Sequence, residues 1–214
     1  MNKEEILAAL AAAVDRLDGP RAGDLVQAGL DAGVAPLLLI NSGLSLGLNR
    51  LGERFQQEDA FIPDLIMGSN IVVAEIDRLK PLLEKDKIAA MSKGKFVIGT
   101  VAGDIHDLGK NLVKLILATA GWETIDLGND VPNEKFVEAV IQHRPVWLGL
   151  SALLTTSMVG QKEVIDLLVE KGIRAQVRIM IGGSPCSQFW ADQIGADAYG
   201  ADPVEAVKKA DAVR

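Results

Sequence analysis

The sequence predicts an α/β protein made of two parts: a four-helix bundle over residues 1–91 and a five-stranded parallel sheet covered by helices over residues 92–214. Three observations support this fold class. Apolar residues recur at helical spacing through the first 80 residues. From Phe96 onward, short β-branched runs alternate with helical patterns, as in βα units. The charged segment from Glu84 to Lys95 separates the two patterns and is predicted as a linker; a helical extension of the bundle is the alternative, with the boundary still near residue 92.

The composition is that of an ordinary globular protein with enough apolar residues to build a core. Of 214 residues, 49% are hydrophobic and 24% are charged. The formal net charge of −7 argues against non-specific binding to nucleic acid or to an anionic membrane. Because the chain begins without a signal-peptide pattern and has a single cysteine, we expect a cytoplasmic protein.

The N-terminal part is predicted to form amphipathic helices with short connections, which implies a small bundle. The first two helices are expected at residues 4–17 and at about 21–32. Pro36 suits the first turn of a long third helix. Pro63 opens a fourth helix, whose apolar stripe is expected to consist of Ile66, Val73, Ile76 and Leu79.

The C-terminal part alternates strands with helices. Strands are expected at residues 96–101, 122–127, 146–151, 177–181 and 197–199. Helices are expected at residues 109–120, 133–143, 158–171, 187–194 and 202–213. Right-handed crossovers cover both faces of such a sheet. A flavodoxin/Rossmann-like strand order, 2-1-3-4-5, places a ligand crevice beside the first and third strands.

A polar loop follows the first strand and carries Asp104 and His106, with Gly103 at its turn. Imidazole is a good ligand for transition metals, and a ligating histidine usually donates its other N–H to a carboxylate. The Asp-x-His spacing places such a carboxylate two residues away. Taken alone, the pattern also fits a histidine that caps a helix or faces solvent.

Two later strands end in further small and polar residues. Ser151-Ala152-Leu153 follows the third strand, and Gly182-Gly183 follows the fourth. Together with Asp104-x-His106-x-x-Gly109, these motifs resemble in order and spacing the cobalamin-binding domain of corrinoid methyltransferase proteins and methionine synthase. Because all three motifs lie at the carboxyl ends of strands, the resemblance is specific, and with the helical part it covers essentially the whole chain.

The resemblance implies that cobalamin, or a related corrinoid, binds with its benzimidazole base removed from cobalt and with His106 as the lower axial ligand. It also implies a relay in which Asp104 and Ser157 share a proton with His106, which helps the imidazole to bind or to leave. The nucleotide tail of the cofactor would lie in a channel beside the sheet. Further contacts with the cofactor are expected from Gly103, Ile105, Asp107, Gly109, Ser151, Leu153, Thr155, Gly182, Gly183 and Tyr199.

Some of these residues have simpler explanations. Thr155 and Ser157 precede a predicted helix, where a hydroxyl serves as an N-cap. Tyr199 ends the last strand, where packing at the sheet edge explains it equally well. Cys186 is interpreted as a small buried residue instead of a redox group or a ligand.

The helical part carries a second resemblance. Residues 50–55, ending in Phe55, and Phe61-Ile62-Pro63 are similar to the cap of methionine synthase over the upper face of the corrin. Phe55 and Ile62 occupy the matching positions, so the resemblance implies an apolar lid against water and oxygen. The alternative is that both side chains pack within the bundle.

The resemblance implies a corrinoid methyl carrier: the corrinoid subunit of a methyltransferase, without a complete active site of its own. Methanol, a methylamine, a quaternary amine and a methoxylated aromatic are open as methyl donors, and a pterin or a thiol as acceptor. The expected partners are a substrate-specific methyltransferase, an acceptor methyltransferase and a reductive activator. The main alternative is a cobalamin-based sensor, and a mutase subunit or a flavodoxin-like receiver are further alternatives.

Overall fold

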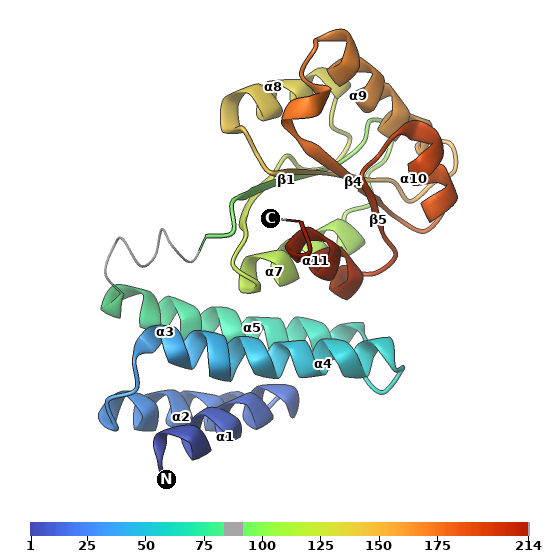
Figure 1. The fold of residues 1–214 in the computed structure, drawn as a ribbon. Coiled ribbons are helices and arrows are strands. Elements are labelled where there is room, and N and C mark those ends of the chain that lie inside the picture. The colour runs from blue at the N-terminus through green and yellow to red at the C-terminus, as the bar shows by residue number, and fades with distance from the viewer. Residues whose placement is uncertain (84–91, 214) are drawn as a thin grey trace. The chain divides into compact units, whose positions relative to one another are not determined.

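The structure is a computed structural model that describes residues 1–83 and 92–213. The chain divides into two compact units, Met1–Met91 and Ser92–Arg214 (Figure 1). Residues 84–91, which make up most of the predicted linker, lie outside the described residues.

The first unit is a bundle of α1 (Lys3–Asp15), α2 (Gly19–Asp31), α4 (Leu46–Gln56) and α5 (Ile62–Leu79). The predicted third helix is a composite of three segments. It begins as α3 (Pro36–Leu39) and passes through a π-helical segment, η1 (Ile40–Ser45), into α4. A π-helical turn holds an extra residue, and the apolar spacing of the sequence does not reveal it.

The buried face of α5 differs from the predicted stripe. Leu79 is buried as predicted, but Ile66, Val73 and Ile76 are only half-buried. The other residues of α5 that are buried are instead Leu65, Gly68, Ser69 and Val72. The prediction counted only apolar residues, whereas this interface uses small ones: Gly68 lies against Leu48 and Leu51 of α4.

The second unit contains a parallel sheet in the predicted order β2-β1-β3-β4-β5. Its strands are β1 (Lys95–Thr100), β2 (Glu123–Asp126), β3 (Trp147–Ser151), β4 (Arg178–Gly182) and β5 (Ala198–Gly200). Every predicted strand is therefore confirmed, with ends that differ by no more than one residue. This order brings the carboxyl ends of β1 and β3 side by side.

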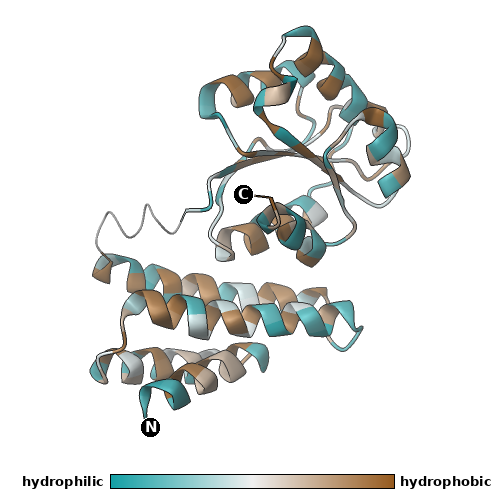
Figure 2. Ribbon diagram, in the orientation of Figure 1, coloured by the Kyte–Doolittle hydropathy of each residue, from teal (hydrophilic) through white to brown (hydrophobic). Residues whose placement is uncertain are grey.

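Helices cover both faces of this sheet (Figure 1). One face packs against α8 (Asn133–His143), α9 (Val159–Glu170) and α10 (Gln188–Ile194), over a cluster that includes Phe136 and Leu148. The other packs against α7 (Leu108–Thr119) and α11 (Pro203–Asp211), over a cluster that includes Phe96 and Trp147. Brown and teal alternate along these helices in Figure 2, as expected of helices with one buried and one exposed face.

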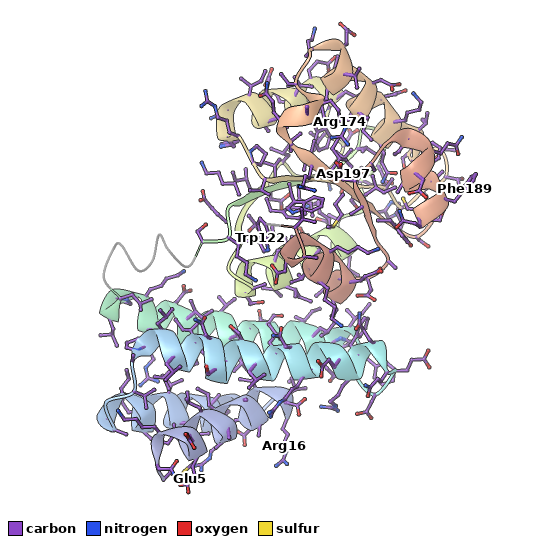
Figure 3. The ribbon with its side chains drawn as sticks, in the orientation of Figure 1. Glu5, Arg16, Trp122, Arg174, Phe189 and Asp197 are labelled. Atoms are coloured by element: carbon purple, nitrogen blue, oxygen red, sulfur yellow. The ribbon has the colours of Figure 1, made fainter. Side chains whose placement is uncertain are left out.

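An ion pair stabilises the amino ends of β4 and β5. Arg174 Nη2 lies 2.7 Å from Asp197 Oδ2, and the same oxygen accepts a hydrogen bond from the Ile179 N–H at 2.7 Å (Figure 3). This contact lies at the opposite edge of the sheet from the strand ends that carry the predicted site. We therefore assign it to stability.

Candidate functional site

The loop after β1 places the Asp104 carboxylate at the centre of a hydrogen-bond network. Asp104 is fully buried. Its Oδ1 accepts hydrogen bonds from His106 Nδ1 at 2.7 Å and from the His106 backbone N–H at 3.0 Å. Its Oδ2 accepts from Ser157 Oγ at 2.6 Å and from the backbone N–H groups of Leu153 at 2.7 Å and Leu154 at 3.3 Å. One side chain thus joins the β1 loop to the β3 loop.

The donors around Asp104 keep it ionised. Burial alone would raise its pKa, but hydrogen bonds from Ser157, His106 and Leu153 outweigh burial and hold the pKa of Asp104 well below its ordinary value. Because an ionised carboxylate only accepts hydrogen bonds, Nδ1 of His106 carries the proton. The Nε2 atom is then the ring nitrogen whose lone pair can bind a metal ion.

The structure therefore brings together the three residues of the predicted relay. The hydroxyl of Ser157 donates to Asp104, and the N-cap position of α9 falls at Met158 without a side-chain hydrogen bond. Helix capping consequently does not explain Ser157. Thr155 lies exposed in the same turn and does not cap α9 either.

A pocket of about 800 Å3 opens beside His106, lined by residues of the sheet, α7 and α11. Most of the predicted contact residues line this pocket: Ile105, His106, Asp107, Gly109, Ser151, Leu153, Gly182, Gly183 and Tyr199. Asp104 and Ser157 support His106 without lining the pocket. Gly103 shapes the loop, and its backbone N–H donates to Asp130 Oδ1 at 2.8 Å.

Gly183 allows the β4 loop to approach the β3 loop closely. Its φ angle is +120°, a conformation that favours glycine. A Cβ atom at this position would lie 1.8 Å from the carbonyl oxygen of Ala152. Any side chain would force the two loops apart and reshape the pocket edge.

Exposed apolar side chains surround His106, whose own side chain is 46% exposed. Ile105 is 72% exposed, Leu108 69% and Leu153 43%. All three line the same pocket. Apolar surface grouped around a polar ligand is typical of a site that a large apolar partner covers.

Sequence reasoning missed a buried glutamine behind the pocket. Gln161 of α9 is fully buried, and its Nε2 donates to the carbonyl oxygens of Leu150 at 3.0 Å and Gly182 at 3.2 Å. Its Oε1 accepts from Trp190 Nε1 at 2.9 Å and lies 3.4 Å from Cys186 Sγ. The amide therefore ties the ends of β3 and β4 together. A glutamine in a helix carries no sequence signal for this role.

Cys186 and Lys110 are also buried beside the site. Cys186 is a small buried residue as predicted, and burial raises the pKa of its thiol. Lys110 lines the pocket, and its Nζ lies 2.6 Å from Asp126 Oδ1 and 2.9 Å from Asn111 Oδ1. A lysine in the first turn of a helix is usually exposed, so the sequence did not indicate its burial.

Within residues 1–83 and 92–213, no three His, Cys, Asp or Glu side chains gather into a group that could hold a metal ion. A metal at His106 would therefore have fewer than three such ligands from the described part of the protein. Over the same residues, every helix is too short or too polar to cross a membrane.

The fold and the site define a class of protein: an α/β domain with a pocket beside a histidine loop at the carboxyl ends of its strands, preceded by a helical bundle. The family described as "B12 binding domain" matches residues 94–208. A second family with the same description matches residues 6–80.

Relatives with names indicate which kind of B12-binding protein this chain is. Trimethylamine corrinoid protein 1 of Methanosarcina mazei is 42% identical over 208 residues, which cover 97% of this chain and 96% of the relative. Dimethylamine corrinoid protein 1 of Methanosarcina acetivorans is 41% identical over 213 residues, 98% of each chain. The chain belongs to the B12 binding domain family, as a corrinoid methyl-carrier protein of the methyltransferase systems.

Solved structures agree with this assignment. A cobalamin-binding protein from Desulfitobacterium hafniense matches with a TM-score of 0.84 and 34% identity, over 96% of this chain and 97% of that one. The methanol:cobalamin methyltransferase complex MtaBC from Methanosarcina barkeri matches with a TM-score of 0.82 and 31% identity, over 100% of this chain and 81% of that one.

The residues around His106 fit a corrinoid. A corrin ring supplies four equatorial ligands to cobalt, so one imidazole nitrogen suffices from the protein, in keeping with the lone histidine here. The exposed side chains of Ile105 and Leu108 match an apolar macrocycle. The neighbouring pocket has room for a nucleotide-sized group.

Proposed function

We propose that His106 binds the cobalt of the corrinoid through Nε2 as the lower axial ligand, with the cofactor's own base removed and its nucleotide tail in the adjacent pocket. One observation carries this proposal: the 2.7 Å contact between His106 Nδ1 and the buried Asp104 carboxylate. That contact fixes the tautomer in which Nε2 has a free lone pair at the edge of the pocket.

Asp104 and Ser157 control the proton on His106. Bound cobalamin would supply the cobalt ion that carries the methyl group between partners. While Nε2 is engaged, Asp104 holds the proton on Nδ1. A proton shared along Ser157, Asp104 and His106 would help the imidazole to bind the cobalt or to leave it. Ser157 donates to the far oxygen of Asp104 and orients the carboxylate.

The remaining contacts follow from the pocket. We infer that Ile105 and Leu153 meet the edge of the corrin, because their exposed side chains flank His106. Residues at the strand ends and in the loops that line the pocket would hold the tail: Asp107, Gly109, Ser151, Gly182, Gly183 and Tyr199. Gly103 shapes the loop. A contact between Thr155 and the corrin stays a prediction, since Thr155 lies exposed outside the pocket lining.

We also propose that Phe55 and Ile62 shield the upper face of the corrin. Phe55 is half-buried near the end of α4, and Ile62, the first residue of α5, is 44% exposed. Apolar side chains left accessible at a helix connection are available to cover a ligand. The match of residues 6–80 to a B12 binding domain supports this role for the bundle.

For the methyl donor we propose a methylamine, with trimethylamine or dimethylamine favoured over methanol. The observation in favour is the identity of 40–42% to corrinoid proteins named for these amines, against 31% to the methanol complex. The protein would act in the cytoplasm as the carrier subunit of a methyltransferase. Its partners would be an amine-specific methyltransferase, a methyltransferase that passes the group to a pterin or a thiol, and a reductive activator.

Electron paramagnetic resonance tests the ligand assignment. The full chain, labelled with 15N-histidine and loaded with Co(II) cobalamin, should show hyperfine splitting from one histidine nitrogen on cobalt. His106→Ala should lose this splitting. His143→Ala is the matched control, because His143 is the only other histidine. Splitting that is absent in the wild type, or that persists in His106→Ala, would contradict the assignment.

A further inference from the structure

The pocket extends well below the ends of the strands. Across the sheet, Thr100 pairs with Ser151, and Ser151 pairs with Gly182, so these residues form the uppermost row. The next row on the same face is Ile98, Gly149 and Met180, about 6.6 Å lower because side chains on one face recur every second residue. All three residues of this second row line the pocket, and so does Phe96, a further two residues down β1.

The lower end of this pocket is apolar. Phe96, Ile98 and Met180 of the sheet are each at most 4% exposed, and they belong to one buried cluster with Ala206 of α11 and with Val113 of α7 packed against it. The polar lining residues His106, Ser151, Ser184 and Asp202 belong instead to the strand ends and the loops that follow them.

Two polar groups near the lower end of the pocket offer no hydrogen bond to a ligand there. The ammonium of Lys110 is held by Asp126 and Asn111, as described above. Nε1 of Trp147 has no hydrogen-bond partner among the described residues, but Trp147 does not line the pocket. The surface offered to a ligand at this depth is therefore hydrocarbon and thioether.

Gly149 lets two buried side chains cover the middle strand at the lower end of the pocket. A Cβ atom at Gly149 would lie 2.8 Å from Phe96 Cε1 and 3.0 Å from Ile98 Cγ1, so the side chains of Phe96 and Ile98 already occupy the space over this glycine. Together with Met180 in the same row, they give the lower end a continuous apolar lining, which we call the apolar slot.

We propose that this apolar slot, formed by Phe96, Ile98, Gly149, Met180, Val113 and Ala206, selects the lower base of the corrinoid. It accepts a benzimidazole and rejects a purine such as adenine. The inference rests on the proposed function, in which the tail occupies this pocket. Adenine carries several ring nitrogens and an exocyclic amine, and these would lose water in the slot without gaining hydrogen-bond partners. Benzimidazole presents mostly carbon.

Binding of three dicyano corrinoids to the purified full chain tests this selection. In the dicyano forms cyanide occupies both axial positions of cobalt. Neither the benzimidazole nor the adenine base is then bound to cobalt, and His106 does not contribute to the affinity as a cobalt ligand. Dicyanocobalamin, its adenine analogue and the tail-free dicyanocobinamide then differ only in the tail. Free and bound corrinoid are separated by ultrafiltration and measured by absorbance. We expect dicyanocobalamin to bind at least tenfold more tightly than both the adenine analogue and dicyanocobinamide.

A matched pair of substitutions tests whether the preference for benzimidazole over adenine arises in the slot. Val113→Asn adds an amide inside the slot and should reduce the preference for benzimidazole over adenine at least threefold. Val169→Asn makes the same change in α9, where Val169 is 59% exposed, and should leave the preference unchanged. Met180→Gln is the second test within the slot, and circular dichroism checks that each variant is folded.

The outcomes separate this inference from the proposed function. Equal affinity of the wild type for the benzimidazole and adenine corrinoids, with both above dicyanocobinamide, would overturn base selection and leave tail binding intact. Equal affinity for all three would overturn tail binding in the pocket. A wild-type preference that neither Val113→Asn nor Met180→Gln reduces would also overturn the assignment to the slot.

Discussion

At the scale of single residues, Asp104 combines a structural and a functional task. Its two oxygens accept hydrogen bonds from the β1 loop and from the β3 loop, so the carboxylate holds two segments together while it orients His106. A buried charge is tolerated only when its hydrogen bonds are complete, as they are here. Substitution should therefore disturb stability and ligand orientation together.

Asp104→Asn should lower the stability of the fold and also change the tautomer of His106. The amide of asparagine keeps one accepting oxygen and places an NH2 group against neighbouring donors, so buried donors lose a partner at a cost of about 1–3 kcal/mol in the free energy of unfolding. Where the NH2 faces His106, the proton should shift from Nδ1 to Nε2, which removes the free lone pair from the atom proposed to bind cobalt. Denaturant unfolding and 15N NMR of the imidazole measure the two effects.

The control for this substitution is Asp107→Asn. Asp107 lies exposed in the same loop and does not cap α7 with its side chain, so the change should leave both stability and tautomer as they are. An unchanged His106 tautomer together with unchanged stability in Asp104→Asn would show that the network has neither role.

At the scale of elements, a buried ion pair fixes α7 to the end of β2. Asp126 Oδ1 lies 2.6 Å from Lys110 Nζ, and Oδ2 lies 2.6 Å from Lys114 Nζ. Partial burial would raise the pKa of Asp126, but the two lysines outweigh it and lower the pKa to about 2. Since α7 carries pocket residues in its first turns, this pair also positions one wall of the pocket.

The Asp126 pair should make the protein sensitive to acid. Because the folded pKa lies below the unfolded value of about 3.9, the pair stabilises the fold fully above about pH 5 and loses its contribution as the pH falls towards 2. The shift corresponds to about 2 kcal/mol. Asp126→Asn should remove this part of the pH dependence. At pH 7 it should also destabilise by roughly 3–5 kcal/mol, because Lys110 would be left buried and unpaired.

Unfolding by denaturant from pH 7 to pH 3 checks this expectation. Glu138→Gln is the comparison, since the Lys135–Glu138 pair is 62% exposed on both sides and should contribute less than about 1 kcal/mol. If Asp126→Asn lost stability with acid as steeply as the wild type, the pair would not be the source of the sensitivity.

At the scale of the whole molecule, the proposed methyl donor is tested with partner methyltransferases. We expect the reconstituted chain to become methylated when it is mixed with a trimethylamine- or dimethylamine-specific methyltransferase and its amine, and more slowly by at least tenfold with a methanol-specific partner. The reason is the higher identity, over nearly the whole chain, to the amine carriers than to the methanol complex. The absorbance of the cofactor follows the reaction, and omission of the amine is the control. Faster methylation with the methanol system would contradict the proposed donor.

Much of this fold was predictable because its signals are local. The alternation of apolar strands and amphipathic helices gave every strand within one residue, and the polar loop motifs marked Asp104 and His106. Gln161 and Lys110 were not predictable, because each is polar in a helix and is buried only through contacts made by distant segments. The π-helical segment at Ile40–Ser45 was missed because one extra residue in a turn barely changes the apolar spacing.

The hydrogen bond between His106 and Asp104 has a consequence for the speed of cofactor loading. A side chain that is ordered only on binding loses freedom worth roughly 0.5–1.5 kcal/mol at that moment. Here a buried carboxylate already holds the imidazole in the folded chain, so the ligation proposed for His106 requires no search by this side chain. Under that proposal, the slow step of loading should be detachment of the cofactor's own base. Once the corrinoid is captured, the loading rate should then follow the strength of the bond between that base and cobalt and not the protein concentration.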